Sequence, residues 1–304
     1  MSAGRRHGEV TRALRELFAD AGVRGWLHVA DLRRPEAAVT LDPDERLPIA
    51  SVYKVPLMVA FCRLADAGTL DPAQPVTLDP ARRVAGPTGL SLLRDPVSMS
   101  LRDLVVMMMT VSDNTAADAV LRAVGPDVVE ETCRALGLPD TQVRGGVTNT
   151  WARLVEETGT GSLSAAMRRL ASNDATVPED VYDPARKSSS TPADIARLLH
   201  AVWTDRAASP ERCAFMREVM SRQAWHHRLA SGFPYDGVRV AGKTGTLGSL
   251  RHEAGVVELP DGATYTAVVF TQAARADSVL PRADAVIGAA ARLSVEALRS
   301  MEGV

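Results

Sequence analysis

The sequence predicts a mixed α/β (α+β) fold, in which an antiparallel sheet flanked by the terminal helices carries an inserted all-α lobe. Three observations predict it: strand patterns lie near both ends of the 304-residue chain, helical periodicity dominates its middle, and amphipathic helices open and close it. Strands from both ends can join one sheet. We therefore expect residues 1–50 and 222–304 to form an α/β lobe and residues 51–221 an all-α lobe. The active site is expected in the cleft between them.

The elements follow in order along the chain. Apolar residues at helical spacing predict terminal helices over 8–21 and 282–300. Period-two and continuous apolar patterns predict strands at 25–31, 37–41, 237–244, 251–259 and 263–272. The helices expected in the middle cover 51–67, 101–110, 114–124, 127–136, 162–171, 192–204 and 210–221. Gly and Pro clusters separate several of these segments.

Composition narrows the class of function. The chain has 35 basic and 37 acidic residues, a near-balance that gives no reason to expect a nucleic-acid or membrane partner. Its three cysteines, Cys62, Cys133 and Cys213, are widely spaced, so we expect ordinary thiols that form neither a disulfide framework nor a metal site. The adjacent pair His226-His227 cannot share one face of a regular element and is interpreted as structural or surface. No apolar run has signal-peptide or transmembrane length, so we expect a cytoplasmic protein. We also expect a monomer or weak homo-oligomer that acts on a small molecule.

A serine and a lysine at the start of one predicted helix suggest a nucleophile and its base. Ser51 and Lys54 are three residues apart, so both side chains lie on one helix face. A serine hydroxyl needs a base to take its proton. Lys54 can serve only if its pKa is lowered, which burial and a second positive charge from Lys243 would both do. Free N–H groups at the helix start would stabilise negative charge near Ser51.

The segment Ser112-Asp113-Asn114 carries three polar side chains in a row. Ser112 can pass a proton between the lysines, Lys54 and Lys243, and the leaving nitrogen or oxygen of a substrate. Asn114 offers an amide that both donates to and accepts from an acyl group. Asp113 is interpreted as structural, with its carboxylate holding the turn.

A third short motif, Lys243-Thr244-Gly245, lies in a predicted edge strand. Lys243 would attract a substrate carboxylate, Thr244 would hydrogen-bond to it, and Gly245 would let substrate backbone lie close. The N–H of Thr246 would pair with that of Ser51 to form an oxyanion hole.

The three motifs S-x-x-K, S-D-N and K-T-G, in this order, resemble the signature of class A β-lactamases and penicillin-binding proteins. The likeness extends to 49–56, 110–117, 241–246 and the Ser-Thr-Pro segment 190–192. The resemblance implies a β-lactamase/transpeptidase-like fold with an active site between two lobes. It also implies β-lactam or D-alanyl amide or ester substrates and no cofactor. A basic residue in the position of Arg251 helps hold the substrate carboxylate in that family.

One part of the family pattern is missing. Class A β-lactamases deacylate with an omega-loop glutamate four residues before an asparagine, and no glutamate of residues 140–191 has that spacing. Glu179 lies nearest the Ser-Thr-Pro segment and is the candidate water activator, with a solvated loop carboxylate as the alternative. The polar residues 172–191 are expected to form a remodelled loop over the cleft.

Three functions therefore remain open from the sequence. The first is a serine acyl-enzyme hydrolase of β-lactams, with Ser51 as nucleophile. The second is a penicillin-binding or sensor-type protein in which the acyl adduct persists. The third is an esterase or acyltransferase that uses the same machinery.

Overall fold

The computed structural model describes residues 3–172 and 179–302, apart from the side chains of residues 3–7, 179 and 302. Its centre is a five-stranded antiparallel sheet in the order β2-β1-β9-β8-β7. The strands are β1 (Val23–Asp31), β2 (Ala38–Leu41), β7 (Arg239–Leu247), β8 (Leu250–Glu258) and β9 (Thr264–Ala273). Strands from both ends of the chain thus share one sheet, as the sequence predicts. The K-T-G motif lies in β7, an edge strand as expected.

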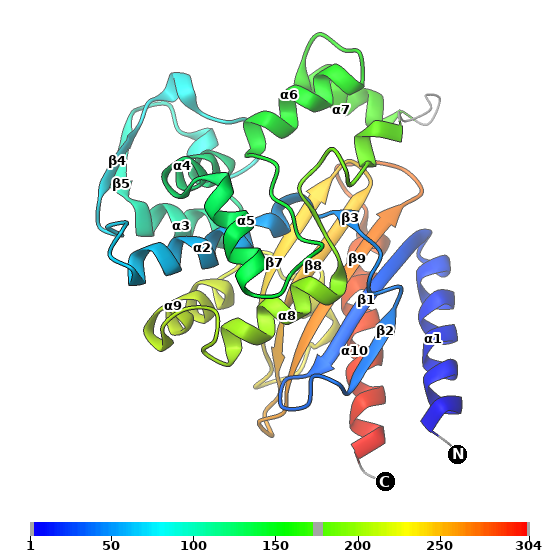
Figure 1. Ribbon diagram of the computed structural model, residues 1–304. Coiled ribbons are helices and arrows are strands. Elements are labelled where there is room, and N and C mark those ends of the chain that lie inside the picture. Colours follow the sequence, from blue (N-terminus) through cyan, green and yellow to red (C-terminus); the bar gives the residue numbers. More distant parts are fainter. Residues whose placement is uncertain (1–2, 173–178, 303–304) are drawn as a thin grey trace.

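The two terminal helices cover one face of this sheet. In Figure 1, α1 (Ala3–Asp20) and α10 (Pro281–Glu302) run side by side along it. Leu14 and Phe18 of α1 pack with Ile287 and Ala290 of α10 against Leu27 and other sheet residues in one buried apolar cluster. This cluster forms because apolar residues recur at helical spacing in both helices and meet the apolar face of the sheet.

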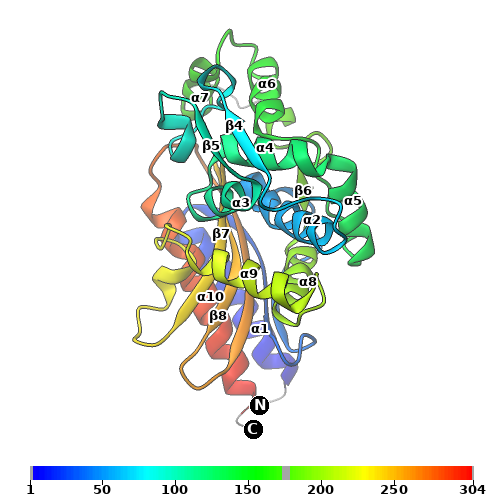
Figure 2. The same ribbon diagram turned by 90° about the vertical axis from the view of Figure 1, so that its left-hand side faces the viewer.

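The helices of the chain's middle lie on the other side of the sheet (Figures 1 and 2). They are α2 (Lys54–Asp66), α3 (Leu101–Thr110), α4 (Asn114–Val124), α5 (Pro126–Ala135), α6 (Val147–Glu157), α7 (Leu163–Ala171), α8 (Pro192–Trp203) and α9 (Pro210–Ser221). The largest buried apolar cluster joins all of these helices except α7 to Trp26 and Phe270 of the sheet. Met108 and Met109 of α3 lie inside it, and the three cysteines are free and buried.

Short elements complete the chain. Two small sheets pair β3 (Leu47–Pro48) with β6 (Ser189–Ser190) and β4 (Pro75–Leu78) with β5 (Val97–Ser100). The 3₁₀ turns are η1 (Ala50–Tyr53), η2 (Pro80–Arg82), η3 (Gly89–Leu92), η4 (Glu179–Tyr182) and η5 (Leu229–Gly232).

Helix α6 is the helix that the sequence interpretation missed, together with the short strands β3, β4, β5 and β6. Its apolar residues Val147, Trp151 and Leu154 do follow helical spacing. Thr148 and Thr150 lower its helix propensity, and its N-cap is Gly146, which supplies no side-chain cap. The sequence therefore lacks the side-chain cap that marks a helix start, although its apolar residues do recur at helical spacing.

A close backbone contact joins η5 to α10 and requires glycine on both sides. A Cβ on Gly232 would lie 2.1 Å from the Gly288 carbonyl oxygen, and a Cβ on Gly288 would lie 2.3 Å from the Arg228 carbonyl oxygen. Both distances are far below van der Waals contact. The contact fixes the backbone of Arg228, whose side chain reaches the site described below.

We predict that Gly288→Ala lowers the free energy of unfolding by about 1–3 kcal/mol, because the new methyl group overpacks a backbone contact. Gly8→Ala in α1 is the matched control, since a Cβ there meets nothing within 4 Å. That change should leave stability equal or raise it by up to about 1 kcal/mol. Urea unfolding of both variants measures the difference, and equal stabilities would contradict the packing argument.

Candidate active site

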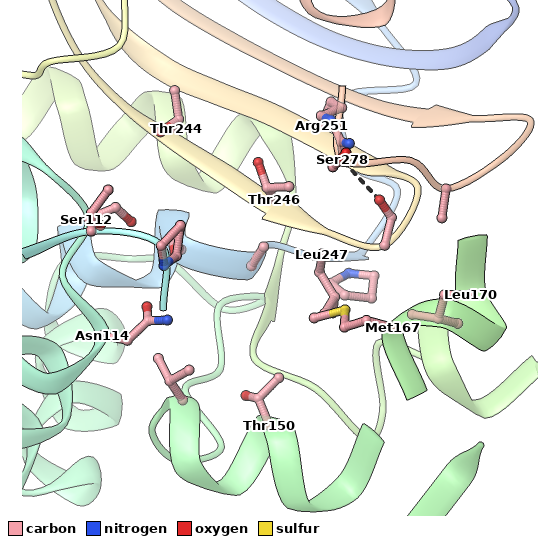
Figure 3. Close-up of a pocket in the computed structure, with 18 of the residues that line it drawn as sticks. Ser112, Asn114, Thr150, Met167, Leu170, Thr244, Thr246, Leu247, Arg251 and Ser278 are labelled. Atoms are coloured by element: carbon pink, nitrogen blue, oxygen red, sulfur yellow. Dashed lines mark hydrogen bonds between the residues drawn. The ribbon is translucent and has the colours of Figure 1, made fainter. Parts of the chain in front are cut away.

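The three motifs border one cavity of about 730 Å³. Ser51, Ser112, Asn114, Thr244 and Thr246 all line it. Figure 3 shows Ser112 and Asn114 at one end of the pocket and Thr244 and Thr246 along the strand beside them. Lys54 and Lys243 are fully buried behind this lining.

Ser51 lies in the 3₁₀ turn η1, directly before α2, and is partly exposed to the cavity. The turn is tight, with the Val52 N–H donating to the Ile49 carbonyl over 3.0 Å and Ala50 at a left-handed φ of 45°. Gly245 packs directly against it, since a Cβ there would lie 2.8 Å from the Ile49 oxygen. The third motif thus lies directly against the turn that carries Ser51.

A buried histidine that the sequence did not single out supports this turn. His252 of β8 has no exposed surface, and its Nε2 lies 3.0 Å from the Pro48 carbonyl oxygen. Nδ1 lies 3.2 Å from the Thr271 N–H, which donates to it, and 2.9 Å from the Arg251 carbonyl oxygen. We assign the proton of the neutral ring to Nε2, which then donates to Pro48 while Nδ1 accepts from Thr271. Burial lowers the pKa of His252 to about 4. The neutral ring therefore holds the segment leading to Ser51 on the sheet.

Lys54 is enclosed by oxygen atoms of the second motif. Its Nζ lies 2.7 Å from the Ser112 carbonyl oxygen, 3.2 Å from Ser112 Oγ and 3.1 Å from Asn114 Oδ1. Burial lowers the pKa of Lys54 to about 7, and the charges of Asp113 and Asp118 oppose that shift. A large fraction of Lys54 is therefore neutral near pH 7, which a base requires.

The second motif is shaped by its backbone and by Asp113. Ser112 adopts a left-handed φ of 58°, unusual for a residue other than glycine, in the bend between α3 and α4. The buried Asp113 caps α4 by accepting from the Ala116 N–H over 3.0 Å and also accepts from the Leu90 N–H. Its predicted structural role is confirmed by these contacts.

In the third motif, the lysine is buried and the edge of the strand is open to the cavity. Burial, together with the charge of Lys54, holds the pKa of Lys243 well below its usual range. The Thr244 N–H points off the sheet and donates to Gln223 Oε1 over 2.7 Å. Side chains and N–H groups two residues apart on a strand point the same way, so the Thr246 N–H also points off this edge, towards the cavity.

Two arginines meet beside Thr246, and the sequence identified only one of them. Arg251 lines the cavity but is 2% exposed, and its guanidinium donates to the Gly248 and Leu250 carbonyls. Arg228 also lines the cavity and donates to Thr246 Oγ1 over 2.8 Å and to Asp284 over 2.7 Å. Arg228 lies in no motif, so only the fold reveals its place. The adjacent His227, interpreted as structural or surface, lies on the cavity wall as well.

The described part of the loop 172–191 contributes residues to the cavity. Lys187 and Ser188 of this loop line the cavity, and Lys187 pairs with the buried Glu157 of α6. Glu179 begins η4, and its side chain lies outside the described residues, so its role stays a prediction. Among the described lining residues, the carboxylates are Asp277 and Asp284, and Asp284 is bound to Arg228.

Comparison with known proteins identifies the family. The model of the "Beta-lactamase enzyme family" matches residues 9–298. The chain belongs to this family. This family member is 34% identical over 305 residues to the beta-lactamase regulatory protein BlaB of Streptomyces cacaoi, covering 95% of this chain and 97% of that protein. It is 28% identical to a beta-lactamase of Amycolatopsis lactamdurans, over 86% of this chain and 76% of that protein.

The fold of this family member matches solved beta-lactamases. It superposes on the crystal structure of a beta-lactamase from Sphaerobacter thermophilus with a TM-score of 0.77 at 25% identity, covering 96% of this chain and 98% of that one. Within residues 3–172 and 179–302, no helix is long and apolar enough to cross a membrane. The same residues contain no group of three His, Cys, Asp or Glu placed to hold a metal ion.

Proposed function

We propose that this chain is a serine acyl-enzyme hydrolase, in which Ser51 attacks the carbonyl of a β-lactam or a related D-alanyl amide or ester. The observation that carries the proposal is the buried Lys54, whose Nζ lies 3.2 Å from Ser112 Oγ at the edge of the cavity that Ser51 lines. A buried amine with a pKa of about 7, beside Ser112 Oγ and three residues after Ser51 in the chain, supplies the base that a serine nucleophile needs.

Acylation follows from these positions. Neutral Lys54 takes the proton of the Ser51 hydroxyl, and Ser51 Oγ forms a bond to the substrate carbonyl carbon. The N–H groups of Ser51 and Thr246 stabilise the resulting oxyanion. As the carbon–nitrogen bond of the lactam breaks, Ser112 gives its proton to the leaving nitrogen and regains one from protonated Lys54. Water then hydrolyses the ester and frees Ser51.

Recognition of a substrate carboxylate is assigned to the β7 edge. Thr244 and Thr246 both line the cavity, and Arg228 donates to the Thr246 hydroxyl. Arg251, the cross-strand partner of Thr246, is buried there and adds positive charge. Both arginines are buried and donate to backbone carbonyl groups, and Arg228 also donates to the exposed Thr246 hydroxyl. Thr244 and Thr246 are therefore the groups placed to contact a carboxylate, with the charge of Arg228 behind Thr246.

We predict that a β-lactam adds its mass to the protein at Ser51 and that Ser51→Ala abolishes the adduct. Ser278→Ala, which alters another serine of the cavity, should still give it. Lys54→Ala should slow acylation by roughly 10²–10⁴-fold, as expected when a general base is lost. Intact-mass spectrometry over time measures all three. An adduct on Ser51→Ala, or an unchanged rate in Lys54→Ala, would refute the assignment.

A second candidate, an acyl-trapping regulatory protein, is favoured by two specific observations. The described carboxylates that line the cavity lie on the side of Arg228, where Asp284 is already ion-paired, so neither is placed as the water activator. In addition, the relative from Streptomyces cacaoi is named a beta-lactamase regulatory protein. In this candidate, Ser51 is acylated by the same steps and the ester persists.

A chromogenic cephalosporin distinguishes the two candidates. For the hydrolase, colour develops steadily over many equivalents of substrate, and the free protein mass returns when substrate is exhausted. For the trap, about one equivalent of colour appears and the acylated mass remains. Colour without any acylated Ser51 would contradict both candidates.

A further inference from the structure

Tyr53 lies between the proposed nucleophile and the proposed base, and its hydroxyl is buried without a partner. It ends the turn η1, two residues after Ser51 and one before Lys54. Tyr53 lines the cavity, although only 5% of it is exposed. No group of residues 3–172 and 179–302 hydrogen-bonds to its hydroxyl. A buried hydroxyl without a partner is costly, and phenylalanine would fill the same space without that cost. A partner that reaches the hydroxyl from the cavity explains why the oxygen is there.

The neighbouring polar side chains of the cavity already have protein partners. Figure 3 shows Asn114 of α4 and Thr150 of α6 across the pocket from the strand β7. Asn114 Oδ1 accepts from Lys54 Nζ over 3.1 Å, and its Nδ2 donates to the Ala85 carbonyl over 2.9 Å. Thr150 Oγ1 donates to the Gly146 carbonyl over 3.1 Å. The phenol hydroxyl therefore differs from both of these side chains in having no protein partner within the described residues.

The phenol of Tyr53 keeps its proton at neutral pH. Burial, and after it the charge of Asp118, hold the pKa of Tyr53 well above its usual range. Asp118 lies one turn after Asn114 on α4, and its charge acts on Lys54 as well. A neutral phenol can hold and orient a water molecule through hydrogen bonds, but it cannot take a proton from that water.

We propose that the Tyr53 hydroxyl binds the water that hydrolyses the Ser51 ester. The inference rests on the proposed function and supplies a residue for its last step. The partner of the hydroxyl must be small, because so little of Tyr53 is exposed that a substituent of the acyl group is too large to reach it. Buried water molecules bind polar groups that otherwise have no partner, which is the situation of this hydroxyl.

Hydrolysis then uses the groups already in place. Lys54 is neutral in the acyl-enzyme, since it has returned its proton through Ser112 to the leaving nitrogen. The bound water donates one hydrogen to Tyr53 Oη and attacks the ester carbon with its oxygen, while its other proton passes to Lys54. The bond between the carbon and Ser51 Oγ breaks, and Ser51 takes that proton from Lys54. The acid product and the free protein result.

Tyr53→Phe tests the proposal because it removes only the hydroxyl oxygen. Protein acylated with benzylpenicillin is freed of excess drug, and intact-mass spectrometry follows the loss of the Ser51 adduct. We expect the adduct on Tyr53→Phe to last about tenfold longer than on the wild type, the effect of losing one neutral hydrogen bond, and to form at an unchanged rate. Tyr235→Phe removes the same atom from an exposed tyrosine outside the cavity lining and should change neither rate.

The two rates separate the proposed role from packing alone, which would slow formation and loss of the adduct together. Equal lifetimes in Tyr53→Phe and the wild type, a parallel slowing of both steps, or a wild-type adduct that does not decay overturns the assignment of Tyr53. Each of these outcomes leaves acylation of Ser51, and thus the first step of the proposed function, intact.

A second arm does not require acylation. Crystal structures of the unreacted wild type and of Tyr53→Phe should show an ordered water hydrogen-bonded to Tyr53 Oη in the first and no water at that position in the second. A wild-type hydroxyl without that water, or bonded to a protein group instead, overturns the inference. If benzylpenicillin gives no adduct on the wild type and the water is present, the proposed function is overturned and the water site at Tyr53 is supported.

Discussion

The burial of the Lys54 amine is the constraint on which the rest of the site depends. Removing an ammonium from water is costly, and here the cost is offset only in part by oxygen atoms of Ser112 and Asn114 within 3.2 Å. The balance leaves the pKa at about 7. The same contacts tie α2 to the bend before α4, so the side chain that we propose as the base also holds the first two motifs together.

The remaining contacts hold the sheet against the first two motifs. Gly245 allows β7 to approach the turn of Ser51 within a distance that any side chain would prevent. His252 holds Pro48 from the neighbouring strand, and the contact of Gly232 with Gly288 fixes the backbone near Arg228. The left-handed Ser112 costs free energy on its own, which the buried cap made by Asp113 helps to offset. These are packing requirements, and they explain why residues without catalytic chemistry matter to the site.

The sequence predicted the sheet, the terminal helices and the residues of three motifs, because period-two patterns and short fixed spacings are local signals. It did not predict α6, whose start has no side-chain cap, or Arg228, which has no motif of its own. The place of Arg228 depends on Asp284 and Thr246, which are 56 and 18 residues away in the chain. The part that α7 plays in the cavity was equally hidden, since Met167 of α7, Leu247 of β7 and Ala276 line the cavity together although they are distant in the chain.

The most direct test of this account is the ionisation of Lys54 itself. NMR titration of the lysine side chains, with Lys54→Met used to assign the signal, reports the pKa of its amine. The account predicts a midpoint near 7, lowered from 10.5 by burial, so that the amine gains its base form as the pH rises through neutrality. A midpoint near 10.5 would leave Lys54 protonated at neutral pH and would contradict its role as the base for Ser51.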